Sequence, residues 1–244
     1  MKKIHIYIGI ILLITACSKD LETPPAATTG FNYLPITKGK VTLYKQTIVT
    51  IDRLVGIYDT TEWVLRETIG EQIAQSKNSK TYRVEVQRRK LDDTQWQPYT
   101  PYELQLSNER IVRVDTNTAV VVLRFPQELG KTWQGNALNI KPNEKFKYTR
   151  FNIDTTIQVS IGTTIQTHAY DSVCEITHRY FPTVVSLQSQ KELYRKDIGL
   201  LRKEVYNVQS QPTHVPPGGI PLDMTKPLLD RLTYGKIEIL EILD

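Results

Sequence analysis

The sequence predicts an all-β domain over residues 33–244, built as an antiparallel sandwich or as a barrel-like curved sheet. Many short runs rich in Val, Ile, Thr and Tyr are separated by turn residues at intervals of about 8 to 15 positions. No long stretch has the 3.6-residue period of an amphipathic helix, and strands do not alternate with helical segments. A hydrophobic content of 40% with 23% charged residues is typical of a globular domain.

The first half of this domain contains the clearest strands. Residues 40–51 have high β-propensity. Residues 63–73 and 81–87 flank a polar turn at 75–80, so they predict a hairpin. Residues 81–87 alternate between two faces, which indicates a half-buried strand: Tyr82, Val84 and Val86 against Arg83, Glu85 and Gln87.

The second half continues the same pattern. Residues 110–114 and 119–125 flank a turn at Asp115-Thr116-Asn117, and residues 119–123 are apolar on both faces, which predicts a central strand covered on both sides. Residues 146–161 alternate and end at a turn, 162–164. The remaining predictions are strands at 172–177, 183–187, 200–206 and 236–243, a Pro/Gly loop at 211–221 and one helical turn within 227–233.

Residues 1–16 predict an export signal. Lys2 and Lys3 precede an apolar stretch, Ile4–Ile14, that is too short to span a bilayer. The following Ile14-Thr15-Ala16-Cys17 resembles the lipobox of bacterial lipoproteins. That resemblance implies that Cys17 becomes the first mature residue and carries a diacylglycerol thioether and an acylated amine, an anchor of two or more chains. The alternative is an ordinary secretory signal with a chance cysteine.

Residues 17–32 predict the lipidated cysteine and a tether, because 21–30 are rich in Pro, Thr and Ala with no apolar period. The run Cys17–Glu22 resembles the Lys/acidic export tag of Bacteroidota surface lipoproteins, although Leu21 interrupts its acidic pair. Ser18 lacks the acidic residue of lipoproteins retained at the inner membrane. These resemblances imply the outer membrane, with preference for the cell surface over the periplasmic side.

The net charge excludes nucleic acid as an expected partner. The formal charge is +5, and loss of Lys2 and Lys3 with the signal leaves +3, spread evenly along the chain. No phosphate-binding, dinucleotide-binding, HExxH, GxSxG or CxxC motif is present, so we expect no cofactor and no catalytic residue.

Three phrases resemble an uncharacterised family of Bacteroidota lipoproteins. They are Tyr33–Lys40, Phe125–Asn136 and Tyr194–Glu204, which match Y-x-P-x-x-x-G, F-P-x-x-x-G-K-x-W-x-G-N and Y-x-K-x-x-G-L-x-x-K-E. The chain departs from the family at Arg195 and at Asp197, where glycine is usual. The family has no assigned activity. We expect the phrases to be structural, with Gly39, Gly130 and Gly199 at positive φ or close approach and Trp133 covering one end of the core.

Other candidate sites are weak. His168, Cys174 and His178 are evenly spaced and would share a face of one strand, as a zinc or copper site requires, but Asp171-Ser172 predicts a break between them. Cys174 alone is expected to be a buried thiol.

Asp92 and Asp93 lie in a polar turn, where neighbouring side chains point apart. A basic stretch is expected on a solvated face, where it could contact anionic headgroups or acidic glycans: Arg83, Arg88, Arg89, Lys90 and Arg110.

Trp63, Trp96 and Trp133 are the candidate ligand contacts, because indole rings stack on sugars, although aromatic side chains in β proteins more often pack in the core. The favoured function is non-catalytic binding or scaffolding by a membrane-anchored envelope lipoprotein, with a protein or glycan of the envelope as partner. The alternatives are a polymer-degrading hydrolase using residues such as Asp92, Asp93 or His178, and a carrier of a hydrophobic ligand.

Overall fold

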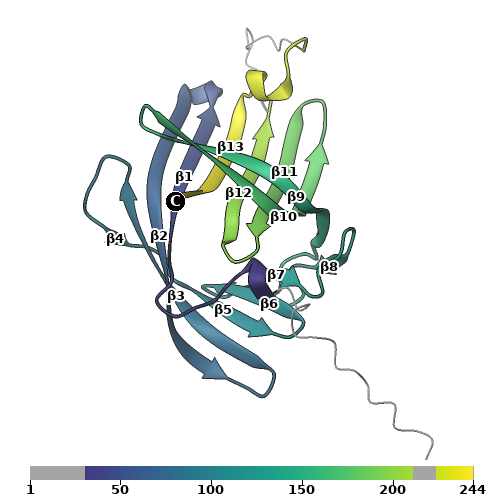
Figure 1. Cartoon of the computed structure of the whole chain (residues 1–244). Coiled ribbons are helices and arrows are strands. Elements are labelled where there is room, and N and C mark those ends of the chain that lie inside the picture. The colour runs from purple at the N-terminus through teal and green to yellow at the C-terminus, as the bar shows by residue number, and fades with distance from the viewer. Residues whose placement is uncertain (1–30, 211–223, 244) are drawn as a thin grey trace, which may run out of the picture.

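The computed structural model describes residues 31–210 and 224–243. They form one 13-stranded antiparallel sheet that curves until its two ends nearly meet, so the all-β prediction is confirmed in its barrel-like form (Figure 1). The strands are β1 (Val41–Asp52), β2 (Ile57–Gln75), β3 (Ser79–Lys90), β4 (Gln97–Pro98), β5 (Tyr102–Ser107), β6 (Arg110–Asp115), β7 (Thr118–Arg124), β8 (Thr132–Gln134), β9 (Lys145–Ile161), β10 (Thr164–Pro182), β11 (Ser186–Arg195), β12 (Gly199–Gln209) and β13 (Tyr234–Leu243). Three short 3₁₀ helices are described: η2 (Phe31–Tyr33), η3 (Arg53–Val55) and η4 (Leu228–Arg231).

Most neighbouring strands in the sheet are joined by hairpins. The order is β7-β6-β5-β3-β2-β1-β13-β12-β11-β10-β9-β8, with β4 paired to β3. The first and last strands of the chain, β1 and β13, pair in the middle of the sheet, for example Tyr44 with Ile242. This pairing joins the two halves of the domain into one sheet.

The predicted hairpin of β2 and β3 is confirmed, with Gln75 opposite Lys80 at its end. Within β3, Val84 and Val86 are buried while Arg83 and Glu85 are exposed, as the alternation predicted. The helical turn expected within 227–233 is η4. The predicted loop 211–221, the signal 1–16 and Cys17 lie outside the described residues.

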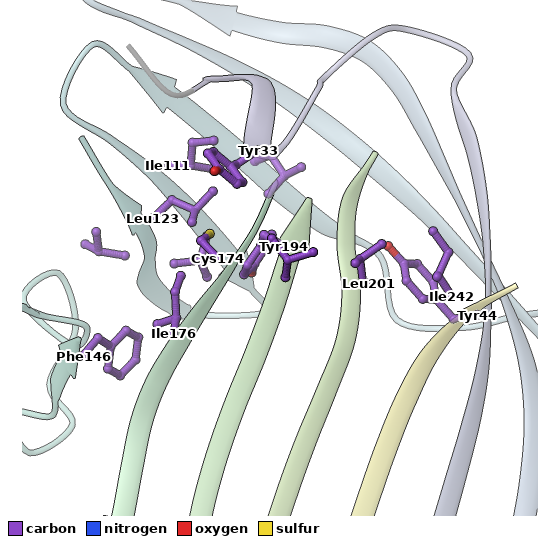
Figure 2. Packing of buried hydrophobic residues seen from close by; sticks show 14 of the residues in the cluster. Tyr33, Tyr44, Ile111, Leu123, Phe146, Cys174, Ile176, Tyr194, Leu201 and Ile242 are labelled. Carbon is purple, nitrogen blue, oxygen red and sulfur yellow. The ribbon is translucent and has the colours of Figure 1, made fainter. Parts of the chain in front are cut away.

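The core lies on the inner side of the curved sheet. Figure 2 shows Tyr33, Cys174 and Tyr194 in the same packed region as Ile111 and Leu123. Tyr33 comes from η2, ahead of the first strand, and retains 1% of its exposure. Tyr33 therefore helps to fill the core from a position ahead of β1.

Side-chain hydrogen bonds and one backbone hydrogen bond, rather than a strand ladder, join the two ends of the sheet at β7 and β8–β9. Trp133 Nε1 donates to Val121 O (2.8 Å), and the Tyr148 hydroxyl donates to Arg124 O (3.0 Å) while accepting from Arg124 N (3.3 Å). The Val121 amide also donates to Gly135 O at 2.9 Å. We call this contact the seam. Trp133 is in the core there, as predicted, against Phe146 and Tyr148.

Two predicted strands need correction. Residues 119–123 lie in β7, which ends the sheet and is not central; Val121, Val122 and Leu123 are nevertheless buried, because the seam covers this strand. Of the predicted strand 183–187, residues 183–185 form a turn and only Ser186 and Leu187 are in a strand, because β10 ends at Pro182 and β11 begins at Ser186. The cause is Thr183, whose hydroxyl accepts hydrogen bonds from the amides of Val185 and Ser186 and so forms a turn.

The predicted break at Asp171-Ser172 is a bulge inside one strand. β10 runs through it, but Ser172 has φ +52° and the register with β9 shifts between Tyr170 and Val173.

The distal half of the β9–β10 hairpin crosses the sheet (Figure 1). Lys45 of β1 faces away from its neighbour Tyr44, yet it is buried and donates to Ser160 O of β9 at 2.5 Å. The hairpin therefore covers the outer face of β1.

The three glycines of the family-like phrases have positive φ, as predicted: +82° at Gly39 and Gly130 and +112° at Gly199. Asp197, where the phrase that this segment resembles has glycine, has φ +64°. The departure is thus accommodated, because Asp is one of the few residues with a side chain that enters this region readily.

Candidate ligand-binding cavity

A cavity of about 990 Å³ lies on the inner side of the sheet. Its lining comes from both halves of the domain, from β1, β2 and β5–β7 on one side and from β9–β12 on the other. Alternation along each strand turns every second residue inward, which places Tyr44, Glu67 and Lys203 in the lining. The volume lies at the upper end of the range that is typical of small-molecule sites.

The first of two polar clusters in the lining comes from β2, β5 and β6. The Tyr102 hydroxyl donates to Glu67 Oε2 at 2.9 Å. The Arg113 guanidinium lies 3.7 Å from the centre of the Tyr102 ring, and its Nε donates to both oxygens of Asp115 at 3.0–3.1 Å. Arg113 nevertheless keeps 32% of its side-chain exposure, because it faces the cavity.

Burial raises the pKa of the Glu67 carboxyl, and the Arg113 charge and the Tyr102 hydrogen bond offset part of that rise. Glu67 is therefore held closer to its neutral, proton-donating form than an ordinary glutamate. Burial also raises the pKa of Tyr102 well above its usual value, with a further rise from the Glu67 charge. The Tyr102 hydroxyl therefore keeps its proton and donates it to Glu67.

The second cluster comes from β10, β11 and β12 around Glu192, which retains 4% exposure. Its carboxylate accepts from the Tyr194 hydroxyl (2.7 Å) and lies 3.2 Å from His178 Nε2 and 3.5 Å from Lys203 Nζ. Gln190 Nε2 donates to His178 Nδ1 at 2.8 Å, and the His178 ring stacks on Phe146 with centroids 3.8 Å apart.

The pKa of Glu192 is well below its usual range. Burial acts to raise it, but attraction to His178 and Lys203 and the hydrogen bonds from His178 and Tyr194 prevail. Glu192 is therefore a carboxylate, with its charge compensated from three sides. Lys203 also lowers the pKa of Glu67, so the two clusters share one field across the cavity.

The rim of the cavity is basic and aromatic. Lys141, Lys145 and Lys147 line it, as does Arg179, whose Nε donates to Glu144 at 2.8 Å. Tyr180 and Phe181, at the end of β10, also belong to the lining and are 56% and 64% exposed. A ligand would pass these ring faces and positive charges before it reaches the two clusters.

None of the three predicted tryptophans lines this cavity. Trp63 lies 4.4 Å from the Arg88 guanidinium, and Trp96 lies under Arg66 and Arg89 at 4.6 and 5.2 Å. Trp133 retains 9% exposure within the seam. Ligand contact by any of the three stays a prediction.

The basic stretch is only partly a solvated face. Arg83 and Lys90 are exposed as expected, but Arg88 is half-buried between the rings of Trp63 and Tyr99, both 4.4 Å away. Arg89 is half-buried too, because it donates to the Asp93 carbonyl at 2.6 Å. These arginines brace the β3–β4 loop by cation–π contact and hydrogen bonding.

The other weak candidates are separated. Of His168, Cys174 and His178, only His178 lines the cavity. Among the described residues, no three His, Cys, Asp or Glu side chains are grouped to hold a metal ion. Cys174 is buried as predicted, and burial raises its thiol pKa to about 12. Asp92 and Asp93 are outside the lining, and the Asp93 carboxylate accepts from the Gln95 amide within its own turn.

Sequence reasoning missed Glu67, Arg113, Glu192 and Lys203. One signal could have found the first. Trp63, Leu65 and Ile69 lie at even offsets along β2, and Glu67 interrupts that apolar series on the same face. A charge at an inward position of a strand indicates a lined cavity rather than a filled core.

Comparison with known proteins leaves the family open. No family model and no curated protein matches the chain. Among solved structures it is similar to a protein of Parabacteroides distasonis ATCC 8503 described as a candidate lipoprotein, with a TM-score of 0.37 and 8% identity over 86% of this chain and 96% of that one. This likeness is too distant to carry an argument about function. Within residues 31–210 and 224–243, no helix has the length and apolarity to cross a membrane.

Proposed function

We propose that this protein is a lipid-anchored bacterial envelope protein that binds a saccharide in its interior cavity without transforming it. One observation carries the proposal: a cavity of about 990 Å³ lined by both exposed aromatic rings and hydrogen-bonding charged groups. Sugars present apolar ring faces beside hydroxyls, and such a lining complements both.

The lining argues against the hydrophobic-ligand carrier. A lipid chain in this cavity would contact Glu67, Arg113 and Glu192, and would strip water from polar groups without replacing its hydrogen bonds. A saccharide can replace those bonds, because each hydroxyl both donates and accepts.

The anchor rests on residues 1–17, whose pattern resembles a lipoprotein signal. Cells that express the chain with Cys17 should incorporate labelled palmitate and retain the product in detergent-phase partitioning. A Cys17→Ala variant should keep the unprocessed size and lose the label. Equal labelling of both would overturn the anchor.

Outer-membrane and surface placement is tested by protease treatment of intact cells: surface display predicts digestion, and a periplasmic orientation predicts protection.

Saccharide binding is tested with the domain that starts after Cys17. A glycan array identifies a bound saccharide, and calorimetry compares the wild type with Val120→Trp. Val120 is half-buried and lines the cavity, so the larger ring should occupy part of it and weaken binding. Val41→Trp is the matched control, because Val41 is 53% exposed and outside the lining. Equal affinity of both variants, with far-ultraviolet circular dichroism unchanged, would place binding elsewhere.

A second candidate is a glycoside hydrolase. The observation that favours it is that Glu67 and Glu192 line one cavity while their pKa values are moved in opposite directions, as a proton donor and a carboxylate partner require. Prolonged incubation with the bound saccharide followed by mass spectrometry separates the two functions. Recovery of intact saccharide supports binding alone, whereas cleavage that Glu67→Gln abolishes would support the hydrolase.

A further inference from the structure

The charges around the cavity are unevenly distributed, and their sign decides which class of ligand the cavity attracts. Four basic residues lie at the rim, Lys141, Lys145, Lys147 and Arg179, against one acidic residue, Glu144. Glu144 already accepts from Arg179. The ammonium groups of the three lysines form no ion pair with any residue in the described part of the chain, and all three side chains belong to exposed residues.

The floor of the cavity is closer to neutral than its rim. Asp115 is paired with Arg113, and Glu192 is compensated by Lys203 and His178. Glu67 is hydrogen-bonded to a tyrosine and held toward its neutral form by burial. The Arg113 guanidinium is engaged with Asp115 through Nε while its side chain stays one-third exposed to the cavity.

Such an arrangement favours a negatively charged ligand. Low-dielectric walls focus the potential of the rim lysines into the opening, which raises the local concentration of anions. At the floor, a guanidinium with free N–H groups is suited to a carboxylate or sulfate. Tyr180 and Phe181 supply ring faces between these two positive regions.

We propose that the cavity takes an anionic saccharide, one that carries carboxylate or sulfate groups, and that Lys141, Lys145 and Lys147 attract it. The proposal rests on saccharide binding by the same cavity and adds the class of the ligand. The rim lysines act through charge, and Arg113 fixes an acidic group at the floor.

The test uses pairs of probes with the same sugar backbone, of which one member carries acidic groups and the other has them neutralised or removed. Calorimetry compares an oligogalacturonate with its fully methyl-esterified form, and a chondroitin sulfate oligosaccharide with its desulfated form. The wild type should bind at least one charged member at least about tenfold more tightly than its neutral counterpart, and this preference should weaken as salt rises from 50 to 300 mM.

Matched charge variants locate the effect. The triple variant K141Q/K145Q/K147Q should lose about tenfold or more in affinity for the charged probe. The control K77Q/K80Q/K90Q removes the same charge from exposed lysines outside the lining and should bind like the wild type.

Each remaining result overturns a defined part of the account. Equal affinity for charged and neutral probes overturns the anionic class and leaves saccharide binding intact. Equal losses in both triple variants overturn the role of the rim. Binding to phosphatidylglycerol vesicles but to no saccharide, or binding to neither, overturns the saccharide proposal as a whole.

Discussion

At the scale of single residues, the interior holds two glutamates whose environments differ in kind. Glu192 is surrounded by a histidine, a lysine and a tyrosine hydroxyl, and its pKa is held low. Glu67 has one hydrogen-bond donor and a more distant guanidinium, and burial raises its pKa. Replacing either glutamate by glutamine removes its titratable carboxyl group and keeps the size and shape of the side chain.

Glu192→Gln should destabilise the domain at pH 7 by about 1–3 kcal/mol, because it removes the charged acceptor of the Tyr194 hydroxyl and the anionic partner of Lys203. A carboxyl whose pKa is lower in the folded than in the unfolded state stabilises the folded protein at pH values above its unfolded pKa, near 4.3. That stabilisation is lost as the pH falls from there through the folded pKa. Urea unfolding at pH 7, 5 and 3 should therefore show a difference from wild type that is constant above about pH 4.3 and shrinks below it. A difference that stays constant throughout the series would contradict the assigned charge.

Glu67→Gln should behave with the opposite sign. A raised pKa disfavours the folded state at pH values above it, so the glutamine variant should be at least as stable as the wild type at pH 7. Its advantage should vanish as pH falls below about 4, where both chains are neutral at this position. The same unfolding series measures it, and a loss of stability at pH 7 would show that Glu67 is a stabilising carboxylate instead.

Asp197 shows how a residue with a side chain is accommodated at positive φ. Its backbone has φ +64°, and its amide donates to Asn32 O at 2.6 Å. Asp197→Gly should be no less stable than the wild type, whereas Asp197→Val should cost about 1–2 kcal/mol, because a β-branched side chain clashes in this conformation. Thermal unfolding measures both, and equal melting temperatures for Gly and Val would contradict the assignment.

Cys174 should be unreactive in the native protein. It has no exposed surface, and its thiol pKa is raised to about 12, so the thiolate that attacks disulfide reagents is scarce at pH 8. A chromogenic disulfide reagent should report no free thiol on the folded lipid-free domain that starts after Cys17 and one on the urea-unfolded domain. Rapid labelling without denaturant would contradict the burial of this residue.

At the scale of elements, the seam decides whether the sheet stays curved. Removal of one hydroxyl in Tyr148→Phe leaves Arg124 N and Arg124 O without their partner. The expected cost is about 1–3 kcal/mol. Hydrogen exchange should accelerate selectively in β7, while β12 in the middle of the sheet keeps the wild-type rate. Uniform acceleration along the chain would show that the seam is not a local closure.

The sequence predicted strands best where burial is one-sided. In β3 the alternation of Val84 and Val86 with Arg83 and Glu85 is visible without a structure, because one face meets the core and the other meets water. It failed at β7, since the apolar run 119–123 reports burial on both faces but cannot distinguish a central strand from an end strand covered by Trp133. The prediction failed at 183–185 because the hydrogen bonds of the Thr183 hydroxyl outweighed β-propensity there.

At the scale of the whole molecule, the candidate site was beyond sequence reasoning for a physical reason. Glu67, Arg113 and Glu192 come from strands that are far apart along the chain and meet only because the sheet curves back on itself. Of the candidate catalytic, metal and ligand-contact residues named from sequence, His178 alone belongs to the lining, where the sequence suggested a metal ligand or a hydrolase residue. Tryptophan was a reasonable candidate for sugar stacking, but the exposed rings at the rim are Tyr180 and Phe181.

The most direct test of the account is a crystal structure of the lipid-free domain with the tightest-binding saccharide. The account predicts the sugar inside the cavity, within hydrogen-bond distance of Arg113 or Glu67 and beside the rings of Tyr180 and Phe181. A saccharide bound on the outer face of the sheet, with the cavity filled only by water, would contradict it.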